Sequence, residues 1–384
     1  MAEWKDWLTA FIRNEGITKI VLFGSGRPVH RIAREVADLE KVVVLALEEG
    51  YIRPGFITAE IGGNNADSPI AGQFPPNSWH KRETPATENH VSGFAAMCRY
   101  GALYYLLRTI FTHGRRKTLF HRTLSPVSEP FFWLRNYVRS KTSRVPDLRA
   151  LSHLLEHHDR AYYIIPLQVS SDGQLQEAAL GWDNTRLITE AIESFGRYAP
   201  EGTRLVFKVH PLERGHCHYT RQIQQCADKI GVGHRVVTLK TGPLSQLVQH
   251  SAGMITINST SGLSAIHHGV PLMVIGQAIY TNSTLADCAM GTPNFARFWQ
   301  TPYPVATAEV RHRYLHWLRE QALCKGDFYH PRGVDVACHQ IVTKLERTIV
   351  PAINIKQKIS PEKKTSTGAS CNTYLPSLAV QSLR

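Results

Sequence analysis

The octapeptide AYYIIPLQ at residues 161–168 starts the pattern that decides the fold. It is a continuous apolar run of strand length, typical of a strand buried on both faces of a parallel sheet. Further strands are expected at residues 204–210, 235–239, 253–257 and 270–275. The segments between them have helical spacing of apolar residues, and this alternation predicts a doubly wound α/β domain. Helices are expected at residues 184–198, 219–230, 243–250, 260–268, 307–324 and 334–350.

A second α/β unit precedes this domain. Strand patterns at residues 17–23 and 41–47 enclose a Gly turn and a helical pattern at residues 29–39, which predicts a right-handed parallel unit. Residues 60–90 are rich in Gly, Asn, Pro and Ser and predict a long loop, which in a compact domain is usually functional or disordered. The expected division is two α/β domains at 1–160 and 161–350, and a disordered basic tail at 355–384.

Composition and charge narrow the class of protein. Hydrophobic residues are 43% and charged residues 20% of the 384 residues, which excludes wholesale disorder, collagen-like sequence and a coiled coil. The net charge of +13 favours an anionic partner or surface. Residues 94–145 carry +9 of that charge, with ten basic side chains and one acid, Glu129. Aromatic residues interleave with them, as on surfaces that bind lipid headgroups or RNA; no recognised nucleic-acid module is present, which favours lipid.

Neither a signal peptide nor a membrane span is expected. The N-terminus MAEWKDW carries acids where a signal peptide needs a basic start and an apolar run. The longest apolar stretches have the length of core strands, well short of the roughly 20 residues that span a bilayer. Seven scattered cysteines without a C-x-x-C pair fit a reducing cytoplasm.

Sequence motifs for cofactors and metals are missing. Gly24 and Gly26 follow a strand, but Val29 stands where a dinucleotide fingerprint has its third glycine. The sequence also lacks a P-loop and the D-x-D motif, with which many sugar-nucleotide transferases hold a diphosphate through a divalent cation. Three histidines between residues 153 and 158 are more typical of a solvated helix face than of a metal site. We therefore predict no cofactor and no metal.

Polar side chains follow several of the predicted strands. Residues 258–262, NSTSG, lie between a strand and a helix and fit either a plain N-cap or an anion site at a helix N-terminus. Lys208 and His210 end another strand of the same sheet, where ligands of doubly wound sheets collect, and this favours a phosphate pocket. Gln168 and Asp172 leave a third strand at the same edge, although Asp172 alone also fits an ordinary turn.

Four sequence strings in order decide between these alternatives. They are residues 48–54, 166–175, 208–211, and 256–265 with Gly269, Pro271 and residues 278–280. In them the chain resembles the bacterial capsule polysaccharide export and biosynthesis family of retaining β-Kdo transferases, most closely the members that start the poly-Kdo linker on phosphatidylglycerol. The resemblance spans residues 20 to about 335. Ser261 stands where relatives often show Val, and the basic tail matches nothing in the family.

The resemblance implies a GT-B-like α/β fold, in which two Rossmann-like domains face a cleft, with CMP-β-Kdo as donor and neither cofactor nor metal. It implies transfer of β-Kdo to phosphatidylglycerol or its lyso form with retention, Asp172 being the nucleophile of two successive inversions. As an exposed strand-end acid, Asp172 is expected to contribute little to packing. Glu48 or Glu49 is the candidate base for the acceptor hydroxyl, and Arg53 meets the Kdo carboxylate or the lipid phosphate. The donor-binding residues are expected to be Gln168, Lys208, His210, Asn258, Ser259, Thr260 and Ser261.

The basic segment is then expected to rest on the inner face of the cytoplasmic membrane, with Arg115, Arg116 and Lys117 binding lipid. Expected partners are CMP-Kdo, the anionic phospholipid acceptor, and other capsule-assembly and export proteins, but no nucleic acid. The alternative function is a noncatalytic capsule-assembly component that binds the glycolipid and delivers it to the exporter. Such a component would tolerate the loss of Asp172.

Overall fold

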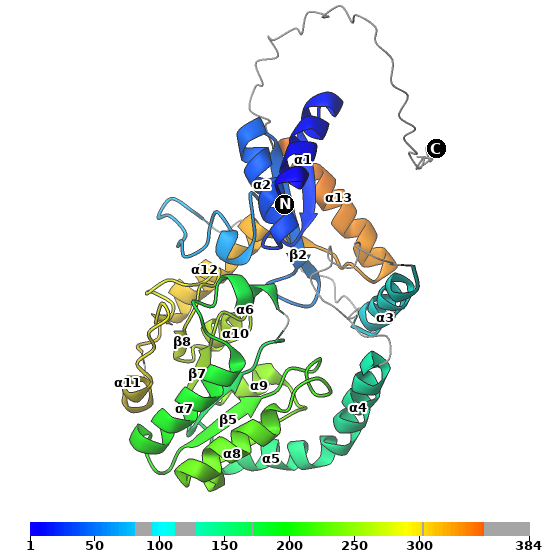
Figure 1. The fold of residues 1–384 in the computed structure, drawn as a ribbon. Helices are drawn as coiled ribbons and strands as arrows, with labels where there is room; N and C mark the ends of the chain where they lie inside the picture. The colour runs from blue at the N-terminus through cyan, green and yellow to red at the C-terminus, as the bar shows by residue number, and fades with distance from the viewer. Residues whose placement is uncertain (81–93, 112–127, 171, 302, 349–384) are drawn as a thin grey trace, which may run out of the picture. The chain divides into compact units, whose positions relative to one another are not determined.

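Two β-sheets flanked by helices form the structure, which confirms the expected α/β class (Figure 1). It is a computed structural model that describes residues 1–80, 94–111, 128–170, 172–301 and 303–348. The tail at 355–384 lies outside the described residues.

The larger sheet has six strands in the order β6-β5-β4-β7-β8-β9, and every neighbouring pair is parallel. Its strands are β4 Tyr162–Pro166, β5 Arg204–Lys208, β6 Val236–Leu239, β7 Gly253–Thr256, β8 Leu272–Val274 and β9 Asp287–Cys288. The winding direction therefore reverses between β4 and β7. Doubly wound sheets bind their ligands at the carboxyl ends of the strands at such a switch point.

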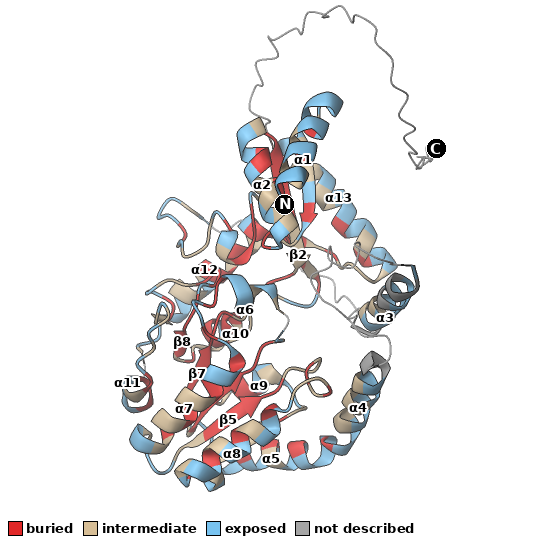
Figure 2. Cartoon of the chain, viewed as in Figure 1, coloured by how far each residue is buried: buried red, intermediate tan, exposed pale blue. Residues whose placement is uncertain are grey.

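Alternate side chains of these strands enter two apolar layers. Tyr162 and Ile164 of β4 pack into one, whereas Tyr163 and Ile165 pack into the other. The first layer contains α5 Arg144–His157, α9 Leu244–Gln249, α10 Gly262–His268 and α12 Ala308–Ala322. The second contains α7 Asn184–Tyr198, α8 Tyr219–Ile230 and α11 Phe295–Gln300. Figure 2 shows β5 and β7 as buried strands beside helices whose outer faces are exposed.

The smaller sheet has the order β1-β2-β3-β10. β1 Lys19–Phe23 and β2 Val43–Glu49 pair in parallel and are connected by α2 Pro28–Glu40, which confirms the predicted strand–helix–strand unit. β3 Phe56–Ile61 pairs antiparallel with β2, and β10 Leu323–Lys325 pairs antiparallel with β3. α1 Ala2–Glu15 packs against α2, and α13 Pro331–Arg347 packs against β10.

The return of the chain to this sheet differs from the expected pattern. The helix expected to continue to residue 324 ends at Ala322, because Leu323 and Cys324 pair with β3 as a strand. Cys324 is buried in one apolar cluster with Ile57 of β3. Pairing with β3, which covers the edge of the sheet, therefore stabilises this segment more than one further turn of helix would. β10, which lies in the expected second domain, thus belongs to the N-terminal sheet, and α13 packs against it, while the boundary near residue 160 stays a prediction.

The basic and aromatic segment contains α3 Phe94–Phe111 and α4 Ser128–Thr142. Both helices expose large apolar side chains: Tyr100, Leu103, Tyr104, Leu106, Leu107, Phe111, Phe131, Trp133, Leu134, Tyr137 and Val138. Arg135 and Arg139 of α4 donate to the backbone carbonyls of Gly215 and Arg214, so these two cations attach α4 to the loop after β5. No helix of the described residues is long and apolar enough to cross a membrane.

Candidate functional site

Gln168 and Asn258 join the carboxyl ends of β4 and β7 across the switch point. The Gln168 side-chain amide donates to Asn258 Oδ1 at 2.9 Å, and the Asn258 backbone N–H donates to Gln168 Oε1 at 3.1 Å. Both residues are buried, and Asn258 Nδ2 also donates to the carbonyl of Gln174 at 2.8 Å. These two expected donor-binding residues therefore hold the two strand ends and the following helix in register.

Asp172 lies beside this clamp, at the N-cap of the short helix α6 Gly173–Glu177. Its carboxylate accepts a hydrogen bond from the backbone N–H of Gln174 at 3.0 Å. The expectation of an exposed acid is wrong, because the side chain is half-buried and caps a helix. Burial raises the pKa of Asp172, opposed by the Gln174 donor and the positive charge of Arg53.

Glu48 and Glu49 are consecutive residues of β2, so their side chains point to opposite faces of the sheet. Burial, and next the charge of Asp172, raise the pKa of Glu48 to about 7, so Glu48 and Asp172 form an interacting carboxylate pair. Glu49 instead accepts a hydrogen bond from the Tyr329 hydroxyl at 2.7 Å. Of the two candidate bases, the structure brings Glu48 to Asp172. The sequence around Glu49 gives no signal of this contact, because Tyr329 lies 280 residues further along the chain.

Arg53 forms an ion pair with Glu49 at 4.0 Å and acts through its charge on groups at the ends of both sheets. Its Nε donates to the Gly50 carbonyl at 2.9 Å, and its side chain is 56% exposed. Its positive charge lowers the pKa of Glu48 and of Asp172, and contributes to lowering that of His210. The Arg53 charge therefore acts on Glu48 of the smaller sheet and on Asp172 and His210 of the larger one. The exposed part of the guanidinium can also be reached by an anion from solvent.

Lys208 is the last residue of β5, and His210 follows two residues later; they lie in a group of basic side chains, here called the cationic cluster. Burial, followed by the charge of Arg214, lowers the pKa of the buried Lys208 to about 8. Burial, and then the charges of Lys208, Arg53 and Arg214, lower the pKa of His210 to about 4, so this imidazole is neutral at pH 7. His210 Nδ1 accepts from the Leu212 backbone N–H at 3.2 Å, which leaves the proton on Nε2 as a donor.

Arg214 is a member of this cluster that the sequence reasoning missed. Its Nε donates to the Lys240 carbonyl at 2.6 Å, which fixes the guanidinium in the loop after β5. Its charge acts on both Lys208 and His210. The negative charge of the buried Asp147 raises the pKa of both Lys208 and Arg214 and so offsets part of their mutual repulsion. The positive charge that remains in the cluster is suited to a phosphate. The sequence feature that could have identified Arg214 was its position, four residues after His210.

Ser259, Thr260 and Ser261 form the turn between β7 and α10, and all three are partly exposed. The Ser259 hydroxyl oxygen accepts from the Ser261 backbone N–H at 3.2 Å and from the Ser261 hydroxyl at 2.8 Å. The Tyr280 hydroxyl donates to the Ser259 carbonyl at 2.5 Å. The turn is thus held by its own hydroxyls beside the Gln168–Asn258 clamp, and its role toward a donor stays a prediction.

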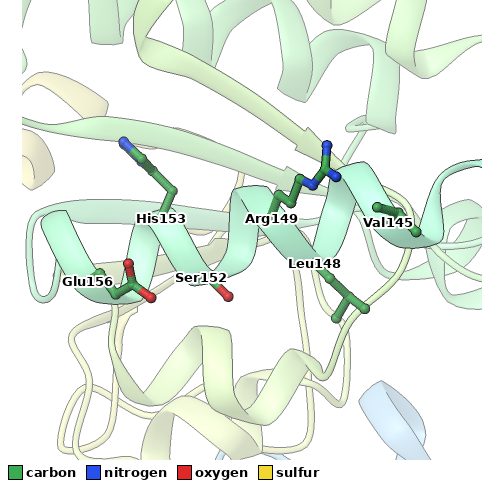
Figure 3. Close-up of a pocket in the computed structure, with 6 residues that line it drawn as sticks. All are labelled: Val145, Leu148, Arg149, Ser152, His153 and Glu156. Carbon is green, nitrogen blue, oxygen red and sulfur yellow. The ribbon is translucent and has the colours of Figure 1, made fainter.

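A surface hollow lies elsewhere, along α5 (Figure 3), and none of the strand-end residues lines it. Its lining residues are Val145, Leu148, Arg149, Ser152, His153 and Glu156. The rings of His153 and His157 stack at 4.6 Å, and within the described ranges no group of three potential ligands could hold a metal. The expected lipid-binding residues Arg115, Arg116 and Lys117 lie outside the described residues.

Comparison with known proteins decides the family. Residues 18–329 match the family described as capsule polysaccharide biosynthesis protein. The chain belongs to this family. The capsule polysaccharide export protein KpsS of Escherichia coli is 33% identical over 304 residues, covering 78% of this chain and 77% of the relative. The capsule polysaccharide modification protein LipB of Neisseria meningitidis serogroup B is 29% identical, covering 84% of this chain and 78% of the relative.

These matches confirm the family resemblance that the four sequence strings indicated. Among solved structures, the β-Kdo 2,4 transferase of Thermosulfurimonas dismutans KpsC is 15% identical, with a TM-score of 0.40. The match covers 78% of this chain and 80% of that chain. A similarity this distant carries no argument about chemistry.

Proposed function

We propose that this capsule family member is a retaining glycosyltransferase that moves β-Kdo from CMP-β-Kdo to phosphatidylglycerol or lysophosphatidylglycerol, starting the glycolipid linker of a capsular polysaccharide. The observation that carries the proposal is the pair Glu48 and Asp172, two interacting carboxylates whose pKa values are both raised by burial, beside a cationic cluster. Interacting acids with perturbed pKa values are typical of sites of acid–base and covalent catalysis. The names of the relatives, a capsule export protein and a capsule modification protein, support a role in capsule assembly.

The donor is proposed to bind with its phosphate against the cationic cluster. A CMP-sugar has one phosphate with one negative charge, which Lys208 and Arg214 can meet while His210 Nε2–H donates a hydrogen bond. The Ser259 to Ser261 turn is proposed to complete this pocket. Arg53 would then meet the carboxylate of Kdo or the phosphate of the lipid.

Two displacements at the anomeric carbon give net retention. In the first, the Asp172 carboxylate attacks that carbon, and the bond to the phosphate oxygen breaks with its electron pair, releasing CMP. In the second, the acceptor hydroxyl attacks the same carbon, the Asp172 ester bond breaks, and Glu48 takes the hydroxyl proton. A pKa of Glu48 near 7 suits a group that accepts and returns a proton.

Acceptor delivery is proposed to occur at the inner face of the cytoplasmic membrane, with the protein peripheral to it. The exposed apolar side chains of α3 and α4 and the +9 of residues 94–145 support contact with an anionic lipid surface. Other capsule-assembly and export proteins are proposed partners.

The test is to incubate the protein with CMP-Kdo generated in situ and a fluorescent phosphatidylglycerol analogue. We expect a product heavier by one Kdo residue, with the β configuration, and none from Asp172→Ala. The wild-type protein binding the glycolipid without forming product would favour the alternative, a noncatalytic component that delivers it to the exporter.

A further inference from the structure

The loop after β3, which the composition of residues 60–90 marks as unusual, contacts Glu48 directly. Asn65 begins its 3-10 turn η1, Asn65–Asp67, at φ 53°, in the left-handed region that Asn tolerates better than most residues. The Asn65 side-chain amide donates to Glu48 Oε2 at 2.5 Å. Asn65 is itself buried, and its contact with Glu48 is part-buried.

A buried chain of hydrogen bonds holds Asn65 in this position. The backbone N–H of Asn65 donates to the Tyr51 hydroxyl at 2.5 Å. The Tyr51 hydroxyl donates to Glu60 Oε2 at 2.6 Å, and the Ser68 hydroxyl donates to Glu60 Oε1 at 2.5 Å. All four residues are buried, so the path from Glu60 through Tyr51 to Asn65 is shielded from water and ends at the half-buried Glu48.

We propose that Asn65 is a positioning residue that holds Glu48 Oε2 and thereby leaves Oε1 as the atom that takes the proton of the acceptor hydroxyl. An amide N–H only donates, so an oxygen that receives it is poorly placed to carry a proton as well. Within the described part of the chain, no hydrogen bond reaches Oε1. The inference rests on the proposed function, because it assigns the orientation of the proposed base.

The charged and polar groups around Glu48 determine the direction of the expected effect. Asp172 and Glu60 raise the pKa of Glu48, and Arg53 and Asn65 lower it. Removing the Asn65 donor therefore disfavours the ionised form of Glu48 further. The rate of a reaction that needs ionised Glu48 should then rise only at higher pH.

The test compares Asn65→Ala and Tyr51→Phe with the matched control Asn282→Ala. Asn282 ties the same loop through a hydrogen bond from its Nδ2 to the Gly72 carbonyl, at 2.8 Å, without any contact with Glu48. The first readout is a ¹³C NMR titration of the glutamate carboxyl groups in the full chain, with Glu48→Gln identifying the signal. The second is the pH dependence of Kdo transfer to the phosphatidylglycerol analogue.

We expect Asn65→Ala to raise the midpoint of the Glu48 signal by about one pH unit, to move the rising limb of the rate profile by the same amount, and to lower kcat about fivefold at pH 7. Tyr51→Phe should act in the same direction but less, and Asn282→Ala should leave both midpoints unchanged. Unchanged Glu48 titration in both Asn65→Ala and Tyr51→Phe would overturn the inference. If the wild-type protein makes no product, the proposed function fails, while the NMR titration still decides whether Asn65 acts on Glu48.

Discussion

Asp172 combines a proposed chemical role with a structural one, so replacing it should have two separable effects. Asp172→Ala should abolish transfer and also lower the free energy of unfolding by about 0.5 to 2 kcal/mol, because it removes the N-cap of α6. Denaturant unfolding and product mass measure the two effects. In a variant that transfers Kdo slowly, mass spectrometry should find Kdo attached to a peptide that contains Asp172.

The matched control is Asp183→Ala, because Asp183 caps α7 by accepting from the Arg186 N–H at 2.7 Å. It should lower stability to a similar degree while keeping full transfer. Normal transfer by Asp172→Ala, or a product of inverted anomeric configuration, would show that Asp172 is not the nucleophile.

Glu48 should make stability depend on pH. Its folded pKa of about 7 lies above its ordinary value of 4.5, so between these pH values the folded state binds more protons than the unfolded state, and stability falls as pH rises. Glu48→Gln removes this cost. The variant should unfold like the wild type at pH 4.5 but be more stable by about 2 kcal/mol at pH 8, the value allowing for partial solvent screening. A difference that stays constant with pH would contradict this assignment.

At the scale of one element, the end of β5 and its loop should govern binding of the nucleotide. Arg214→Gln and His210→Ala should each weaken CMP binding by about 1 to 3 kcal/mol, the usual cost of losing a hydrogen bond to a charged group. Wild-type affinity should also fall above pH 8, as Lys208 loses its proton, and Lys208→Met should remove that dependence. Calorimetric titration with CMP at several pH values measures both effects.

The control is Arg204→Gln at the opposite end of β5, which should bind CMP like the wild type. EDTA should not change the affinity, because the pocket is proposed to use side chains alone. Equal affinities of Arg214→Gln and the wild type would exclude the cationic cluster as the phosphate site.

For the whole molecule, the concentration of charge in residues 94–145 predicts salt-sensitive binding to anionic membranes. Each basic residue near such a surface contributes about 1 kcal/mol. Replacing Arg115, Arg116 and Lys117 with Ser should therefore weaken binding to phosphatidylglycerol vesicles by up to about 3 kcal/mol. Deleting the tail from residue 355, which removes +4, should matter less. Vesicle sedimentation at low and high salt measures the effect; equal sedimentation of variant and wild type would mean that a partner protein delivers the acceptor.

Local sequence pattern predicted most strands of the larger sheet, several of the helices and the strand-end motifs, because apolar periodicity reports which faces of an element are buried. It missed α1, α11, β3 and β10. It predicted the parallel β1–α2–β2 unit, the doubly wound second sheet and the family. It also placed Gln168, Lys208 and Asn258 at one edge, since the carboxyl ends of parallel strands lie together.

Only the tertiary structure decided which of these side chains meet. Nothing local distinguishes Glu48 from Glu49, because the choice depends on which face of β2 lies toward Asp172, 124 residues further along the chain. The return of β10 to β3 and the clamp between Gln168 and Asn258, 90 residues apart, are likewise set by packing. Contacts between distant residues depend on how whole elements pack, and local periodicity carries no record of that packing.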